Sequence, residues 1–138
     1  MQELLQRLGR RDTRILDMCA AANDAWLAFF AELDGADVGT LSARLGLFQR
    51  TITQIFDSPS LGESMMAWGA FASLYDTKTR WGQNERRARE LVQAFAMSNC
   101  TPEVKSEARS AAISYELDTS GQPPTTLAPG ARNRNLFG

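Results

Sequence analysis

The amino-acid sequence predicts an all-α protein built as one compact helical domain. Apolar residues recur at intervals of three and four along most of the chain, which is the spacing of an amphipathic helix. No short segment alternates between apolar and polar residues in the manner of a half-buried strand, and β-branched residues are sparse. At 138 residues the chain is long enough to bury a core and short for two domains.

The first predicted helix spans residues 12–33. Asp12 or Thr13 can cap its N-terminus with a side-chain oxygen, and the Asp34-Gly35 pair is typical of a helix end. Its apolar residues fall on one stripe that we expect to face the core, namely Ile15, Met18, Cys19, Ala22, Trp26, Phe29, Phe30 and Leu33.

The central stretch, Leu41 to Pro59, reads L-S-A-R-L-G-L-F-Q-R-T-I-T-Q-I-F-D-S-P and predicts two short helices joined at Gly46. Ser42 is small enough for the two helices to cross closely, and Gly46 can adopt the positive φ of a tight turn. The apolar residues at intervals that would tie both helices to the core are Leu41, Leu45, Leu47, Ile52 and Ile55. We therefore expect a central helix-turn-helix at residues 40–57.

Three helices are expected after this motif, the last two being additional C-terminal helices: residues 61–75, 85–99 and 102–117. Asn84 can cap the second of them and Thr101 the third, and Pro102 suits a first helical position. Residues 118–138 are rich in proline, glycine and threonine and predict a flexible C-terminal tail. We therefore expect a helical domain over residues 1–117, followed by this tail.

The stretch L-S-A-R-L-G-L-F-Q-R-T-I-T-Q-I-F resembles the helix-turn-helix of the lambda repressor and Cro-type (XRE-like) family of DNA-binding regulators. The family pattern is roughly L-A-x-x-L-G-[VL]-S-x-x-x-[IV]-S-x-[IL], and the matching positions here are Leu41, Leu45, Gly46, Leu47, Ile52 and Ile55. Ser42 replaces the usual alanine and Thr53 the usual serine. The likeness covers about residues 12–76 and implies a sequence-specific transcriptional regulator that binds double-stranded DNA, usually as a dimer.

The resemblance also implies which side chains meet the DNA. The second helix of the motif, residues 48–56, would lie in the major groove, where arginine can make a bidentate contact to guanine and glutamine to adenine. Arg44, on the first helix of the pair, would face the phosphate backbone. The DNA-binding residues expected on this basis are Arg44, Gln49, Arg50, Thr51, Thr53 and Gln54.

A protein partner is the alternative to DNA. Within residues 41–59 the charged side chains are Arg44, Arg50 and Asp57, so the local net charge is only +1, and the whole chain carries −1. Phe48 stands where the family usually has serine or threonine, and it can pack inward or join a protein-binding patch. The alternative function is a non-enzymatic protein-binding module, for example a phage-type inhibitor or adaptor, in which the helix-turn-helix shape contacts a protein.

The composition excludes several kinds of chemistry. The chain has no histidine, so nucleophiles activated by histidine and the usual histidine-containing zinc sites are unavailable. Cys19 and Cys100 are two isolated thiols, which suits a reducing cytoplasm and rules out a four-cysteine zinc site. No apolar run approaches the ~18 residues of a membrane span. We expect no enzymatic activity, no cofactor, no metal and no membrane partner.

Two further features each allow two interpretations. The helices at 85–99 and 102–117 either form a homodimer interface or cover the core; the residues available are Leu91, Val92, Phe95, Ile113 and Tyr115. The basic residues are either solvated helix faces or extra phosphate contacts. One cluster is Arg7, Arg10, Arg11 and Arg14, an N-terminal basic arm in the second interpretation, and the other is Lys78, Arg80, Arg86, Arg87 and Arg89 around Trp81.

Overall fold

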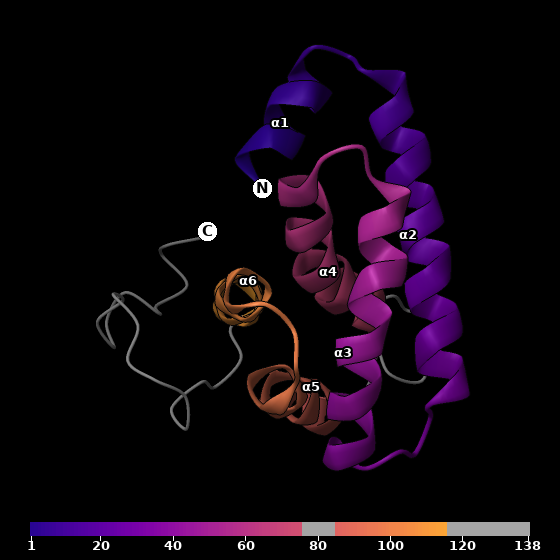
Figure 1. The fold of residues 1–138 in the computed structure, drawn as a ribbon, viewed down its shortest axis with the longest axis vertical. Coiled ribbons are helices and arrows are strands. Elements are labelled where there is room, and N and C mark those ends of the chain that lie inside the picture. Colours follow the sequence, from indigo (N-terminus) through magenta and orange to yellow (C-terminus); the bar gives the residue numbers. More distant parts are fainter. Residues whose placement is uncertain (76–84, 116–138) are drawn as a thin grey trace.

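The computed structural model describes residues 1–75 and 85–115, and every regular element within these ranges is a helix. The all-α prediction is confirmed for this part of the chain. The elements are α1 (Gln2–Gly9), α2 (Thr13–Glu32), α3 (Val38–Ile55), α4 (Pro59–Leu74), α5 (Glu85–Met97) and α6 (Pro102–Ser114), arranged as in Figure 1. The predicted tail at 118–138 and the predicted cap Asn84 lie outside the described residues.

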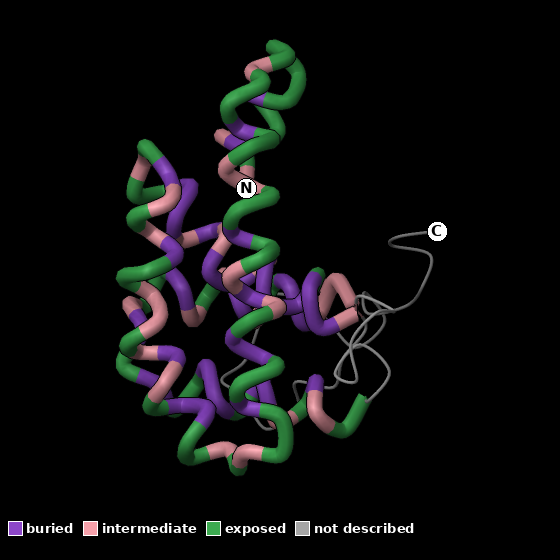
Figure 2. The backbone as a smooth tube through the Cα atoms, turned by 90° about the vertical axis from the view of Figure 1, so that its right-hand side faces the viewer, coloured by how far each residue is buried: buried purple, intermediate pink, exposed green. Residues whose placement is uncertain are grey.

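The core is organised around α4, which packs against α2, α3 and α6 (Figure 1). Small and apolar residues occur all around this helix, so it is buried on most of its circumference. Gly62 and Gly69 allow the neighbouring helices to approach closely. A Cβ at Gly62 would stand 2.8 Å from Cγ2 of Thr53 on α3, and one at Gly69 would stand 3.1 Å from the Trp26 ring on α2. Buried residues accordingly lie mainly in the middle of the molecule (Figure 2).

The prediction for α2 is confirmed in both its start and its buried stripe. Asp12 is the N-cap, and its carboxylate accepts a hydrogen bond of 3.1 Å from the backbone N–H of Arg14. Trp26 is fully buried and donates from its ring nitrogen to the carbonyl oxygen of Met65 at 3.3 Å. Of the predicted stripe, Met18 and Cys19 are partly buried and the other members are buried.

The two C-terminal helices cover the core, as one of the two interpretations expected. Thr101 caps α6 by accepting a hydrogen bond of 3.3 Å from the N–H of Val104. Of the residues considered for a dimer interface, Leu91, Val92 and Phe95 of α5 are buried within the chain, whereas Ile113 and Tyr115 are partly buried.

The predicted helix-turn-helix at 40–57 is wrong, because α3 runs without interruption from Val38 to Ile55. Gly46 lies inside this helix and does not have a positive φ. A Cβ at this position would stand 3.3 Å from the Cβ of Asn99, in the connection between α5 and α6. The glycine therefore allows a close approach between two segments, and it does not make a turn.

A corner between two helices does exist, but it lies at residues 56–58, between α3 and α4. Ser58 is the N-cap of α4, with its hydroxyl 3.4 Å from the N–H of Leu61, and Pro59 occupies the first helical position. The helix that follows this corner is the buried α4. Its position in the core excludes it as a helix that enters a DNA groove.

Candidate interaction surface

Five of the six side chains predicted to meet DNA fall into an inward and an outward group, and the sixth, Arg44, forms an ion pair at the surface. Gln49 belongs to the inward group, because its amide oxygen accepts a hydrogen bond of 3.1 Å from the backbone N–H of Thr101. Its amide nitrogen lies 3.4 Å from the hydroxyl oxygen of the same threonine. Gln49 thus holds the start of α6 against α3, and it cannot reach a base edge without breaking this contact.

Thr53 is also engaged inside the protein. Its hydroxyl donates to backbone carbonyl oxygens of its own helix, 2.9 Å from that of Gln49 and 3.1 Å from that of Arg50. Its methyl group faces Gly62 on α4. The role of Thr53 in this structure is therefore to form the close contact between α3 and α4.

Arg44 forms an ion pair with Glu32, in which the guanidinium Nη2 lies 2.8 Å from the carboxylate oxygen. The pair joins α3 to the end of α2, and both side chains are substantially exposed, so its contribution to stability is small. Arg44 is thus partly neutralised at the surface.

The outward group consists of Arg50, Thr51 and Gln54, which are all exposed on α3. Residues three and four apart lie side by side on a helix, so these three share one face with Leu47. Leu47 is 73% exposed. Within the described ranges no ion pair or hydrogen bond is recorded for the side chain of Arg50.

Leu47 was predicted to lie in the core, and this prediction is wrong. In one continuous helix, Leu41, Leu45 and Ile52 lie on the buried stripe, whereas Leu47 falls on the opposite side. A break at Gly46 would have reset this register and turned Leu47 inward. The exposure of Leu47 is thus a direct result of the uninterrupted helix.

Phe48 packs inward, which decides between the two positions that the sequence left open. Its ring centroid lies 4.8 Å from that of Trp26 and 4.6 Å from that of Phe29. The side chain joins α3 to α2 within the aromatic part of the core. It is therefore partly buried against the core and is not among the exposed large apolar residues of the described chain.

A second exposed apolar residue lies on the helix that packs beside α3. Met97, at the end of α5, is 63% exposed, and two residues later Asn99 contacts Gly46, the neighbour of Leu47. The two most exposed large apolar residues of the described chain, Leu47 and Met97, therefore belong to two helices that pack against each other. We define an α3–α5 surface on these two helices; its residues are Ala43, Leu47, Arg50, Thr51, Gln54 and Met97.

Among the described members of the two basic clusters, Arg7, Arg87 and Arg89 pair with acceptors of the protein, whereas Arg10, Arg11, Arg14 and Arg86 are exposed. In the first, residues 2–9 form α1, and Arg7 is buried in ion pairs. In the second, Arg87 donates to the carbonyl oxygen of Ala36 at 2.7 Å, and Arg89 pairs with Glu85 at 3.4 Å. The other members of the second cluster, Lys78, Arg80 and Trp81, lie outside the described residues, and Arg86 is exposed.

Comparison of the chain with protein-family models, with curated proteins and with solved structures gave no match. Over residues 1–75 and 85–115, no helix combines the length and the apolar character that crossing a bilayer requires. The same residues contain no group of three or more carboxylate, thiol or imidazole side chains placed to hold a metal ion. We therefore take the α3–α5 surface as the candidate site. It contains three of the predicted DNA-binding residues, Arg50, Thr51 and Gln54, together with the exposed apolar side chains of Leu47 and Met97.

Proposed function

We propose that this chain is a non-enzymatic protein-binding module that contacts its partner through the α3–α5 surface. The observation that carries the proposal is the exposure of Leu47 and Met97 on two helices that pack together. Burial of each such side chain against a partner is worth about 1.5–3 kcal/mol. A single exposed leucine needs no explanation, whereas apolar side chains that gather on one surface mark a contact site, and we infer such a surface from the packing of α3 on α5.

The polar residues around these two side chains suit a protein partner. Arginine and methionine are enriched in the centres of protein interfaces, and a polar rim usually surrounds them. Arg50 can pair with a carboxylate of the partner, while Thr51 and Gln54 supply hydrogen-bonding groups. We therefore expect the partner to present an apolar depression beside an acidic side chain.

The non-enzymatic part of the proposal rests on which side chains are present. The chain has no histidine, and burial raises the pKa of both the Cys19 and the Cys100 thiol. A raised pKa disfavours the thiolate, which is the nucleophilic form of cysteine. Both cysteines are free, which supports a reducing compartment such as the cytoplasm.

Double-stranded DNA is a second candidate partner, and one observation favours it. Arg50, Thr51 and Gln54 are exposed on one face of a long helix, and these residue types read base edges in the major groove. The small positive charge of α3 argues against DNA. The helix carries two arginines, and Arg44 pairs with Glu32, so of these two only Arg50 has no carboxylate partner among the described residues. Sequence-specific DNA binding usually draws on several phosphate contacts.

A photo-cross-linking residue at position 51 of the full chain, in the cells from which the protein comes, tests the proposal. We expect one protein to be cross-linked, and we expect Leu47→Asp to abolish the adduct. Leu16→Asp is the matched control, because Leu16 is 56% exposed, belongs to α2 and is not a member of the α3–α5 surface, so its replacement should leave the adduct unchanged.

Two results would contradict the proposal. One is an adduct that survives Leu47→Asp and Met97→Asp together. The other is the enrichment of a DNA sequence from a random library, with binding that Arg50→Ala and Gln54→Ala abolish and that weakens steeply with added salt. If the adduct is a second copy of the chain, sedimentation must show a dimer that Leu47→Asp dissociates.

A further inference from the structure

The N-terminal helix α1 is attached to the rest of the protein mainly through polar contacts. It has eight residues, which is too short for a helix to be stable alone in water. Leu4 is its one buried leucine, whereas Leu5 and Leu8 are 60% and 40% exposed. With so little apolar burial, the position of α1 must depend on other contacts.

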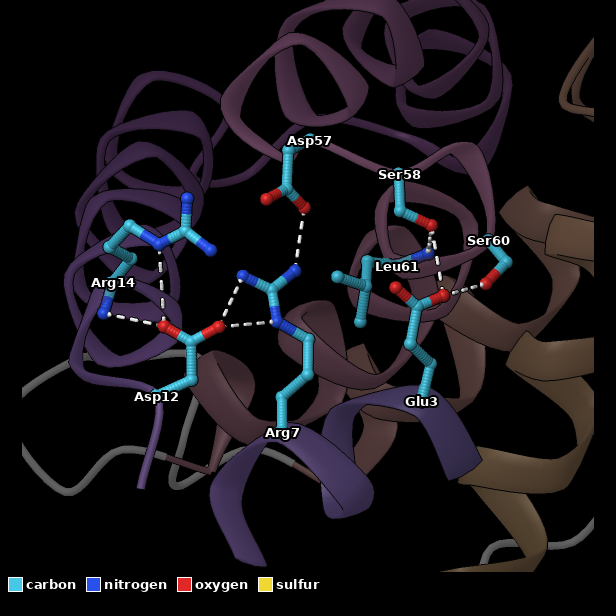
Figure 3. A network of polar contacts seen from close by, with 8 residues as sticks. All are labelled: Glu3, Arg7, Asp12, Arg14, Asp57, Ser58, Ser60 and Leu61. Carbon is cyan, nitrogen blue, oxygen red and sulfur yellow. Dashed lines mark hydrogen bonds and ion pairs between the residues drawn. The ribbon is translucent and has the colours of Figure 1, made fainter. Parts of the chain in front are cut away.

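Arg7 makes the first of these contacts, from the middle of α1 to two other segments (Figure 3). Its Nη1 donates to the carboxylate of Asp57, in the corner between α3 and α4, at 2.6 Å. Its Nε donates to the carboxylate of Asp12, the N-cap of α2, at 2.9 Å. The side chain is only 6% exposed, so a lost partner would leave a buried cation incompletely paired.

Glu3 makes the second contact, one turn earlier on α1. One of its carboxylate oxygens accepts hydrogen bonds from the hydroxyls of Ser58 at 2.9 Å and Ser60 at 2.7 Å (Figure 3). Both serines belong to the first turn of α4 and its cap. Arg7 and Glu3 therefore fasten α1 to the corner between α3 and α4 and to the first turn of α4.

The connection between α1 and α2 has the features of a hinge. Arg11 has a φ of 57°, and it is the one described residue other than glycine with a positive φ. An L-residue in this left-handed region is strained by about 1 kcal/mol or more. Strained residues of this kind cluster at sites that switch conformation.

A pocket of about 500 Å³ lies beside the N-terminal end of α1. Met1, Gln2 and Glu3 form part of its wall, and residues of α4 and α6 form the rest, among them Ser64 and Ser106. The pocket thus lies where α1 meets the packed helices α4 and α6. Removal of α1 would open this side of the pocket to solvent.

We propose that α1 is a detachable strap, fastened by Arg7 and Glu3 and hinged at Arg11, which opens the pocket between α4 and α6 while α2–α6 stay folded. The opening is a local event of lower free energy than unfolding of the whole domain. Because α1 and the first turns of α2 project from the other helices (Figure 2), α1 can leave without displacing them.

Acid weakens the strap, since each of its carboxylates is ionised in the docked state. The hydrogen bond from Arg7 lowers the pKa of Asp57 and of Asp12, and hydrogen bonds from Ser60 and Ser58 lower the pKa of Glu3. The other charged side chain here is Arg14, which contacts Asp12. A lowered pKa stabilises docking above the ordinary carboxyl range and loses this effect as the pH falls below about 4.

Hydrogen exchange of the full chain, followed by mass spectrometry, tests the proposal. The amides of residues 5–12 are hydrogen-bonded only within α1 and its cap, so they report its opening. In the wild type they should exchange faster than the amides of α4. In Asp57→Asn their exchange should rise about tenfold or more, while that of α4 changes less than about twofold.

Glu32→Gln is the matched control, because it removes an ion pair of α3 without touching α1, and it should leave exchange in residues 5–12 unchanged. A salt series on the wild type gives a second measurement that needs no variant. Raising the ionic strength to about 1 M should speed exchange in α1 alone. The proposal is overturned if α1 and α4 exchange at one common rate in the wild type, or if neither salt nor Asp57→Asn affects α1 selectively.

Discussion

Gly46 on α3 lies directly against Asn99 in the connection between α5 and α6. A Cβ at position 46 would stand 3.3 Å from the Cβ of Asn99 and 3.4 Å from its backbone nitrogen. This contact sets how closely α3 approaches the C-terminal helices. It also explains why a glycine is tolerated inside a helix, where it costs about 1 kcal/mol relative to alanine.

Gly46→Ala should change the free energy of unfolding by less than about 1 kcal/mol, because the gain in helix propensity and the tight contact with Asn99 oppose each other. Urea denaturation monitored by circular dichroism measures the change. At a turn with positive φ the same substitution would be clearly destabilising. A loss of more than about 2 kcal/mol would contradict this balance, because the contact with Asn99 would then outweigh the gain in helix propensity.

Gly62→Ala should destabilise the protein by about 1–3 kcal/mol. The added methyl would stand 2.9 Å from the Cα of Thr53, and backbone cannot move aside as the end of a flexible side chain can. The same denaturation experiment measures this change. If Gly62→Ala and Gly46→Ala lowered the free energy of unfolding equally, α3 and α4 would not approach as closely at Gly62 as the structure indicates.

The helices that the sequence predicted well are those whose signals are local. The apolar stripe of α2, its Asp12 cap and the Thr101 cap of α6 all lie within or beside their own helix. Gly46 could be interpreted in two ways, because glycine occurs both in tight turns and where two segments of backbone approach closely. Only Asn99, which is remote in the sequence, decides between the two.

The candidate site was predicted only in part, because some of its side chains are positioned by segments that lie far away in the sequence. Arg50 and Gln54 are exposed as expected, but the contact of Gln49 with Thr101 depends on a segment far along the chain. Leu47 was missed because its register was counted from a break that does not exist. Counting the apolar spacing across Gly46 as one helix would have placed it outside.

Gln49→Ala should lower the free energy of unfolding by about 1 kcal/mol, because it removes the hydrogen bond to the backbone N–H of Thr101. Gln54→Ala is the natural comparison. Gln54 is exposed on the same helix, and its replacement should stay within about 0.5 kcal/mol of the wild type. Thermal denaturation of both variants checks the difference, and an equally stable pair would argue against the inward position of Gln49.

Phe48→Ala should destabilise the protein by about 3 kcal/mol, since it removes a ring that packs on both Trp26 and Phe29. The change should also alter the emission of Trp26, which is fully buried in the wild type. Fluorescence-detected unfolding therefore reports both effects. A stable variant with unchanged emission would place Phe48 at the surface.

Asp37→Asn should make the stability of α3 less dependent on pH. The carboxylate of Asp37 accepts a hydrogen bond of 2.7 Å from the N–H of Thr40, and this bond lowers the pKa of Asp37. Its contribution is present at neutral pH and is lost as the pH falls through the lowered value, below about 4.

Asparagine caps helices about as well as aspartate and does not titrate. The melting temperatures of wild type and Asp37→Asn should therefore diverge as acid is added, with the wild type falling further. If the melting temperatures of the two proteins fell in parallel down to about pH 2, protonation of Asp37 would not contribute to the loss of stability in acid.

The burial of α4 on most of its circumference limits how the polypeptide can be shortened. Val104, Ala108, Ala111 and Ala112 of α6 are buried, and α6 packs on α4. An expression fragment that stops after residue 75 would expose this apolar side of α4 to water, and the fragment would be prone to aggregate. The smallest piece worth producing for crystallisation or labelling therefore reaches at least to Ser114.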